Sequence, residues 1–370
     1  MAWAEKRSNG RYSGVYRDAA GQKVRVPGTF ANKQEAVRQA SKKELEERDA
    51  PTPQGARNIT WGEWESQWQS GRVVASSTAR SDKGRLRDHI RPRWGRTLLR
   101  DITTDAVQQW VMELTRKGLA PSTVTKCYHL LSASMKAAYN ARLVVANPCR
   151  GVTLPKPGPM PEHFLDESET DAIKVTLDEF DTLVFELLLG TGMRLGEAMG
   201  LHWESVNLRR RVVAVEWAYD PVAQEMKAPK DYERRTIPIG STLTKLLSEH
   251  QKQTGMGKPA PAPVKYPRTA RVHTGLVLAH TDGRPFDPSN FRHRFNASVR
   301  IAYVGKGKQR HWIGETRIHD LRHTYASRLL ENGIPIEEVS RLLGHANITT
   351  TMRYAHRARS QWDTVRAALG

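Results

Sequence analysis

The chain has 370 residues, 38% of them hydrophobic, with a formal net charge of +19 at pH 7 and a pI of about 10.1. We expect no membrane span, because no apolar run approaches the roughly 18 residues that a span needs. We expect no signal peptide, because the N-terminal segment MAWAEKRSNGRYSG has no apolar h-region. Two isolated cysteines, Cys127 and Cys149, exclude a disulfide framework. These features favour a cytoplasmic, multidomain protein that binds nucleic acid, since a phosphate backbone attracts a positive surface.

Residues 1–55 are predicted to form a small unit of strands and one helix. Segments 11–18 and 23–30 alternate as two strands joined by a turn, with Lys23 and Arg25 on one face of the second strand. Such a basic ribbon fits the major groove of DNA. A solvated sheet face explains the same two residues equally well.

A helix start is predicted at Asn32, where Glu35 three residues later completes a pattern similar to a capping box. The helix is expected to continue to the segment 49–58, whose proline and glycine residues indicate a linker.

Residues 59–150 are predicted to be wholly helical. Trp61, Trp64 and Trp68 recur on one helical face, which is more typical of a packed core than of a surface that stacks on bases. A strongly basic run lies between the helical segments, and its density favours phosphate contact over a merely solvated face. Its candidate DNA-binding residues are Arg80, Lys83, Arg85, Arg87, Arg91 and Arg93.

A proline-rich segment, 150–164, marks the next boundary, and helix signals dominate the remainder. Segments 210–220 and 234–240 are expected to form a strand pair. Residues 253–275 read as a mobile loop.

Four segments beyond this boundary carry residues suited to phosphodiester chemistry. They are TGMRLGEAMGLHW with Arg194 and Glu197, APKDYERRTIPI with Lys230, IHDLRHTYAS with His319 and Arg322, and GHANITTTMRYAH with His345 and Tyr354.

Cleaving a phosphodiester without metal requires a nucleophile, cations for the phosphate oxygens and an acid for the leaving oxygen. Arginine donates bidentately and stays charged, and lysine or histidine can deliver a proton. The spacing of His319 and His323 also fits zinc, but Asp320 stands where a zinc protease has glutamate, and Arg322 would repel the ion. We therefore expect no metal and no other cofactor.

The order of these motifs closely resembles the tyrosine recombinase (phage integrase) family, and within it lambda-type integrases with an N-terminal arm-binding domain. The resemblance implies a mainly α, multidomain α+β chain with small β-sheets. It divides the chain into a three-stranded arm-type DNA-binding domain (1–55), a helical core-binding domain (59–150) and a mixed α/β catalytic domain (162–370).

The resemblance also implies a role for each motif residue. Arg194 and Arg322 hold the scissile phosphate, Lys230 is the general acid, His319 accepts the tyrosine proton or orients the phosphate, His345 donates to a non-bridging oxygen, Glu197 supports the site, and Tyr354 attacks to form a 3′-phosphotyrosyl link. Lys227 competes with Lys230 for the acid role. Tyr354, which in isolation fits a packing role, competes with Tyr325 as nucleophile.

The family implies a homotetramer on two synapsed double-stranded DNA sites, exchanging strands through a Holliday junction. An integrase would also use a bending protein similar to integration host factor and an excisionase. The alternatives are an Xer-like dimer resolvase, which normally lacks a unit such as 1–55, a type IB topoisomerase, and a DNA-binding regulator without chemistry.

Overall fold

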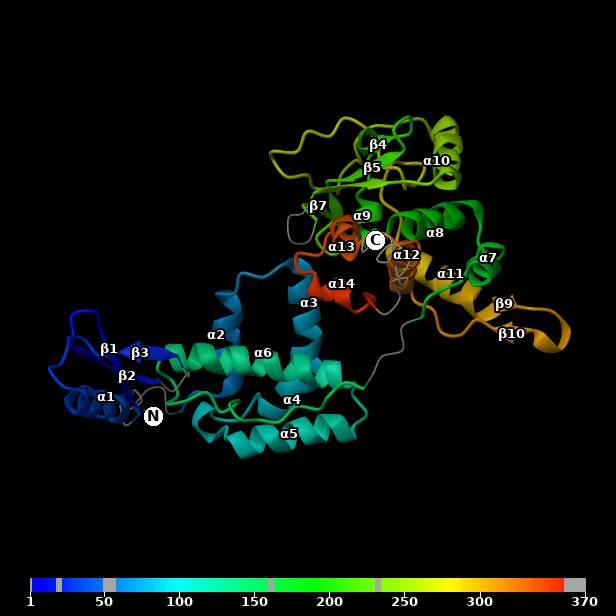
Figure 1. Cartoon of the computed structure of the whole chain (residues 1–370). Helices are drawn as coiled ribbons and strands as arrows, with labels where there is room; N and C mark the ends of the chain where they lie inside the picture. Colours follow the sequence, from blue (N-terminus) through cyan, green and yellow to red (C-terminus); the bar gives the residue numbers. More distant parts are fainter. Residues whose placement is uncertain (1, 18–21, 49–57, 159–162, 230–233, 356–370) are drawn as a thin grey trace. The chain divides into compact units, whose positions relative to one another are not determined.

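The computed structural model describes residues 2–17, 22–48, 58–158, 163–229 and 234–355, and forms two compact units, Met1–Met160 and Pro161–Gly370. Helices dominate both units and the sheets are small, which confirms the predicted fold class (Figure 1). Within the described ranges, every helix is too short or too polar to cross a membrane. Because the first unit includes both domains predicted before residue 150, the division between them stays a prediction.

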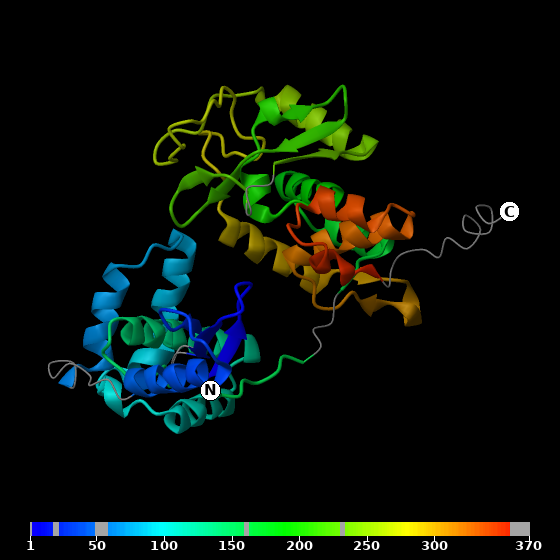
Figure 2. The ribbon, with the colours of Figure 1, turned by 60° about the vertical axis from the view of Figure 1, so that its left-hand side comes forward.

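The N-terminal elements are a three-stranded antiparallel sheet and one helix, which lie against each other in both views (Figures 1 and 2). Their bounds are β1 Trp3–Lys6, β2 Tyr12–Arg17, β3 Lys23–Arg25 and α1 Lys33–Arg48. Gly14 permits the close approach, since a Cβ there would lie 2.4 Å from the carbonyl oxygen of Ala36. The two strands read from the residues are confirmed, and β1 supplies the third.

Residues 58–158 contain helices and helical turns around one core. Their bounds are α2 Trp61–Ser70, α3 Ser76–Arg85, a π-helical turn Leu86–Ile90, α4 Arg91–Trp94, a 3₁₀ turn Leu99–Asp101, α5 Thr104–Arg116 and α6 Pro121–Asn140. Trp61 and Trp64 are buried, and their indole N–H groups donate to Ser134 on α6. The core role predicted for the tryptophans is confirmed, with Trp68 packed at the core's edge.

Helices supply most of the core of the C-terminal unit, and strands β5 and β8 add Val213, Val215 and Ile237 to it. The described residues of this unit form three small antiparallel sheets. The helices are α7 Glu167–Lys174, α8 Glu179–Thr191, α9 Leu195–Met199, α10 Ser241–Thr254, α11 Pro288–Ile301, α12 Ile318–Glu331, α13 Ile336–Leu343 and α14 Thr349–Met352. The strands are β4 Val206–Asn207, β5 Val212–Val215, β6 Ala218–Asp220, β7 Glu225–Lys227, β8 Arg235–Pro238, β9 Tyr303–Val304 and β10 His311–Trp312. The buried helix α8 packs against both α10 and α12.

The predicted strand pair is confirmed, because β5 pairs with β8 and places Val213 opposite Ile237. The predicted loop is confirmed from Gly255 onward, whereas residues 253 and 254 still belong to α10. This loop has a core of its own, in which Ala260 and Val264 pack with Met226 and Leu276. Burial of these side chains holds part of the loop in place, although the composition of residues 253–275 had indicated a mobile segment.

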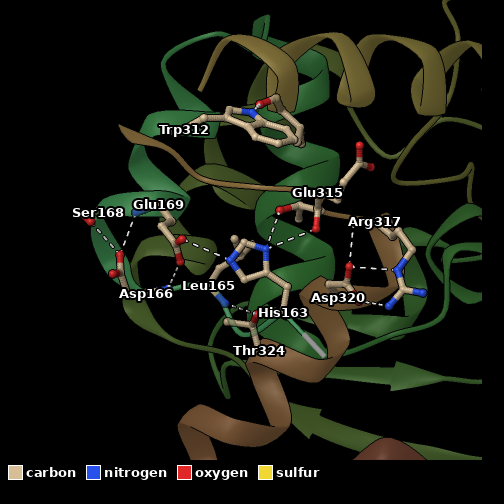
Figure 3. A network of polar contacts seen from close by, with 12 residues as sticks. His163, Leu165, Asp166, Ser168, Glu169, Trp312, Glu315, Arg317, Asp320 and Thr324 are labelled. Carbon is tan, nitrogen blue, oxygen red and sulfur yellow. Dashed lines mark hydrogen bonds and ion pairs between the residues drawn. The ribbon is translucent and has the colours of Figure 1, made fainter. Parts of the chain in front are cut away.

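The start of this unit is tied to the beginning of α12, the helix that carries the H-x-x-R motif (Figure 3). The His163 ring lies 3.1 Å from Glu169 Oε1 and 3.0 Å from Thr316 Oγ1 through its two nitrogens. The backbone N–H of Leu165 donates to Thr324 Oγ1 at 3.0 Å. These contacts join residues 163–169 to α12 and so help to fix its position in the unit.

Candidate active site

Arg194 caps a short helix that begins directly after a turn at Gly192. The turn takes Gly192 into the left-handed region at φ +62°, and a Cβ there would lie 2.4 Å from the Tyr325 ring. Arg194 then lies at the start of α9, where its backbone N–H and its Nη1 donate to Glu197 at 2.9 and 3.0 Å. In this motif the partly exposed guanidinium of Arg194 is therefore held by the buried carboxylate of Glu197.

A second arginine, Arg235 on β8, holds the same carboxylate and was not among the predicted site residues. Its Nη atoms donate to the Glu197 oxygens at 3.3 and 2.6 Å, and its Nε donates to the carbonyl of Leu342 at 2.7 Å. Burial alone would raise the pKa of Glu197, but Arg235 and then Arg194 hold it below its usual value. The available signal was strand alternation, which places Arg235 on the buried face with Ile237.

Arg322 projects from α12 and is only 2% exposed. It donates to the carbonyls of Gly192 and Leu343, each at 2.6 Å. Burial, and next the charge of Arg194, lowers its pKa to about 9, which leaves it cationic at neutral pH. Arg322 and His319 line a pocket of about 410 Å³ with the cations of Arg292 and Arg317, a setting suited to an anion.

The two predicted histidines lie in the same cationic surroundings. Burial, followed by the charge of Arg322, lowers the pKa of His319 and brings that of His345 to about 4. Both rings are therefore neutral at pH 7. The Nδ1 of His345 forms a 2.8 Å hydrogen bond with the hydroxyl of Thr351 on α14.

Tyr354 is 2% exposed, and its hydroxyl forms a short hydrogen bond with Nδ1 of His323. Phe164 contacts its ring edge-on, and the Arg353 guanidinium lies 5.7 Å from the ring centre. The sequence pattern around His323 had indicated only a possible zinc ligand. In the described part of the chain, no group of three or more His, Cys, Asp or Glu side chains is placed to hold a metal ion.

The competing tyrosine, Tyr325, packs into the core of the unit against Gly192, which Leu343 also approaches. Burial raises its pKa to about 12, which disfavours a phenolate. Its surroundings therefore fit the packing role better than the role of nucleophile.

The competing lysine, Lys227, ends β7, and its ammonium lies 2.6 Å from the carboxylate of Asp220. Lys230 lies outside the described residues. Its predicted role as general acid therefore stays a prediction, while Lys227 has an acidic partner within its own hairpin.

Most of the candidate DNA-binding side chains are exposed, and several also have a partner within the protein. Lys23 and Arg25 are exposed on β3 and both pair with Glu5, at 2.5 and 3.1 Å. In the basic run, which forms α3, the π-helical turn and α4, every candidate side chain is exposed except that of Arg85, which is half-buried. Four of them have local partners, namely Asp82 for Arg85, Asp88 for Arg87, Glu65 for Arg91 and the Trp94 ring for Arg93.

Comparisons with known proteins found similar sequences over much of the chain. The family model described as "Phage integrase family" matches residues 162–361. A "Tyrosine recombinase XerC-like" protein of Caldanaerobacter subterraneus is 28% identical over 275 residues, covering 69% of this chain and 67% of that protein. A protein assigned as the prophage phiRv2 integrase of Mycobacterium tuberculosis is 26% identical over 373 residues, covering 98% of this chain and 93% of its own.

Two solved structures share the fold. The Tn1549 transposon integrase in complex with transposon right end DNA matches with a TM-score of 0.67 and 19% identity, over 84% of this chain and 98% of that chain. The lambda integrase tetramer bound to a Holliday junction matches with a TM-score of 0.62 and 18% identity, over 96% of each chain.

Proposed function

The chain belongs to the phage integrase family, and from this premise we propose that it integrates phage or mobile-element DNA by site-specific recombination. It is a tyrosine recombinase, an enzyme that cleaves and rejoins DNA strands. The observation that carries the proposal is the convergence of two guanidiniums, two neutral histidines and a tyrosine hydroxyl in one unit. These groups match the needs of phosphoryl transfer without metal.

In the proposed mechanism, Tyr354 attacks phosphorus and forms a 3′-phosphotyrosyl link, while Lys230 protonates the departing 5′ oxygen. Arg194 and Arg322 neutralise the non-bridging oxygens, where arginine forks fit best. This assignment is supported by the pocket that Arg322 lines. The bond energy stays in the phosphotyrosine, so rejoining needs no ATP.

His345 donates to a non-bridging oxygen in this mechanism. Its Nδ1 lies 2.8 Å from the Thr351 hydroxyl. When that hydroxyl donates the hydrogen bond to Nδ1, the single N–H of the neutral ring is on Nε2 and can donate to the phosphate. Glu197 holds Arg194 in position, and Arg235 in turn holds Glu197. His319 accepts the tyrosine proton or orients the phosphate.

The active assembly is proposed to be a homotetramer on two DNA sites, with strands exchanged in pairs through a Holliday junction. The similarity in fold to a lambda integrase tetramer on such a junction supports this assembly. An accessory bending protein and an excisionase belong to the same proposal.

The presence of residues 1–55 favours integration over Xer-like dimer resolution. The similarity to the phiRv2 prophage protein covers 98% of this chain, and that to the XerC-like protein covers 69%. In this proposal, the three-stranded sheet and helix that precede the helical region bind a second DNA segment.

The decisive experiment uses a suicide DNA substrate that traps the covalent intermediate, followed by a strand-exchange assay between two attachment sites. Covalent adducts exclude a regulator without chemistry, and strand exchange excludes a type IB topoisomerase. Integration of a circular plasmid into its target, with little resolution of directly repeated sites, separates an integrase from a resolvase. Failure to form any adduct would overturn the proposed function.

A further inference from the structure

The histidine that contacts the hydroxyl of the proposed nucleophile is His323, four residues after His319 on α12. His323 and Tyr354 are 3% and 2% exposed, so bulk water has little access to this hydrogen bond. We propose that His323 is a catalytic residue that removes the proton of Tyr354 during DNA cleavage. This inference rests on the proposed function, because it requires Tyr354 to be the nucleophile.

The positions of the two histidines on α12 indicate a different role for each. His319 and His323 lie one turn apart on the same face, with perpendicular rings whose centres are 4.7 Å apart. His319 lines the pocket beside Arg322, where an anion would bind. His323 faces the tyrosine hydroxyl. The family resemblance left two roles open to His319. The position of His319 fits the orientation of the phosphate, and the acceptance of the tyrosine proton then falls to His323.

The groups around His323 suit a proton acceptor. Nδ1 of a neutral imidazole can accept a hydrogen bond from the phenol, and both side chains are buried. Among the described residues, the titratable groups near His323 include Tyr354, His319 and the neighbouring Arg322, and Arg353 lies against the tyrosine ring. Arg322 is close enough to Tyr354 for their charges to interact, and it therefore stabilises the phenolate as it forms.

The step balances in atoms and charge. The O–H bond of Tyr354 breaks and its proton moves to Nδ1 of His323, while the phenolic oxygen bonds to phosphorus and the bond to the 5′ oxygen breaks. The 5′ oxygen takes a proton from the general acid, proposed to be Lys230. On rejoining, the 5′ oxygen attacks phosphorus while its proton returns to Lys230. The bond between phosphorus and the Tyr354 oxygen breaks, and His323 returns its proton to that oxygen.

The test measures single-turnover formation of the covalent adduct by the full chain on a suicide substrate, from about pH 6 to the phenol range near pH 10. The key variant is His323→Asn, whose amide lies near the Nδ1 position and can hydrogen-bond but cannot accept the proton. His319→Asn is the matched control. At pH 7 we expect His323→Asn to react about 100-fold more slowly, the size of a general-base effect. This deficit should shrink as pH rises, because hydroxide then ionises the phenol, whereas that of His319→Asn should persist.

A substrate with sulfur at the 5′ bridging position adds a second readout, because its leaving group needs no protonation. This substrate should restore the rate of adduct formation to variants that lack the general acid, whereas His323→Asn should stay slow. A wild-type rate for His323→Asn, a deficit equal at every pH, or rescue by the sulfur substrate would each overturn the assignment.

Two further controls keep the test decisive. If His323→Asn fails to bind DNA in a gel shift, the pH profiles of the wild type and of His319→Asn decide. A plateau near neutral pH in both profiles supports a histidine acceptor other than His319, and a rate that climbs without a plateau up to the phenol range overturns it. An adduct formed by Tyr354→Phe would instead overturn the nucleophile assignment in the proposed function.

Discussion

Arg235 donates to both carboxylate oxygens of Glu197, at 2.6 and 3.3 Å, and both side chains are buried. Glu197 also accepts from Arg194, so one carboxylate connects strand β8 to the arginine proposed to bind phosphate. Arg235 additionally holds the Leu342 carbonyl and packs against Gly344, where a Cβ would lie 3.0 Å from its Nη1. Arg235 therefore stabilises the candidate site through two sets of contacts, one with Glu197 and one with the segment from Leu342 to Gly344.

Replacing Arg235 with Met should destabilise the protein and slow DNA cleavage. Removing one partner of a buried ion pair costs about 3–5 kcal/mol, because the other charge is left less compensated. Arg234→Met is the matched control, since Arg234 is exposed beside it. Denaturant unfolding gives the free energy, and a suicide substrate gives the cleavage rate. A stable, fully active Arg235→Met would contradict this stabilising role.

The double variant Arg235→Met with Glu197→Leu separates stability from positioning. Replacing both partners of a buried pair with apolar residues is often neutral for stability. We therefore expect the unfolding free energy to recover and cleavage to stay low, because Arg194 has lost its carboxylate. Recovery of both properties would mean that Glu197 does not position Arg194.

Tyr354→Phe should bind DNA with unchanged affinity and form no covalent adduct, since only the phenolic oxygen is removed. Loss of its hydrogen bond to His323 should lower the unfolding free energy by about 1 kcal/mol. Gel shifts and trapping on a nicked substrate measure binding and attachment. Tyr325→Phe is the control and should keep forming adduct. If the two variants behaved in the opposite way, Tyr325 would be the nucleophile.

The site shows what sequence patterns can and cannot predict. Arg194, Arg322 and Tyr354 could be proposed from the sequence because each stands in a motif whose order along the chain is specific. Arg235 and His323 contact partners that are distant in sequence, Glu197 and Tyr354, and only the folded chain brings each pair together.

The same limit applied to the fold. Periodicity predicted the tryptophan core and the β5–β8 pair, because burial on one face leaves a repeating pattern. Strand β1, Trp3–Lys6, has only four half-buried or exposed residues and leaves no such pattern. It is fixed by its pairing with β2.

Arg194→Ala should lower the cleavage rate by about 100-fold to 1,000-fold with a modest loss of DNA affinity, since it acts on charge that develops in the transition state. Arg322→Ala should do the same, and should also destabilise the fold by leaving the carbonyls of Gly192 and Leu343 without their donor. Arg341→Ala, on the exposed side of α13, is the control. Rates on the suicide substrate and gel shifts provide both quantities.

EDTA should leave cleavage unchanged, because arginines supply the positive charge at the phosphate. The assay compares adduct formation with and without the chelator, after dialysis. A strict requirement for added zinc or magnesium would contradict the metal-free mechanism.

Stability should fall in mild acid because of His345. Its folded-state pKa is about 4, whereas an unperturbed histidine has a pKa of about 6.5. Between these values the unfolded chain binds the proton more readily, so the free energy of unfolding decreases as pH falls from about 6.5 to about 4. Urea unfolding on both sides of this window should show a smaller change for His345→Asn. His319, whose pKa is also lowered, should preserve part of the effect.

Deleting residues 1–55 should leave a protein that binds and cleaves a core site but integrates poorly when the attachment DNA carries distal arm sites. The N-terminal sheet presents Lys23 and Arg25, while every proposed catalytic residue lies beyond residue 160. A second binding site on one protomer raises the local concentration of the second DNA segment. Recombination between paired plasmids and footprinting of the whole attachment DNA measure the two activities.

A point variant makes the same test without truncation. Replacing Lys23 and Arg25 with Ala removes two cations from the exposed face of β3, both held by Glu5 in the free protein. Replacing Lys42 and Lys43 on α1 removes the same charge from the helix. If the sheet reads the arm site, the first pair should abolish the arm footprint and the second should weaken it only slightly. Equal effects would indicate general attraction to DNA. Full recombination by the truncated protein with an unchanged footprint would favour an Xer-like resolvase.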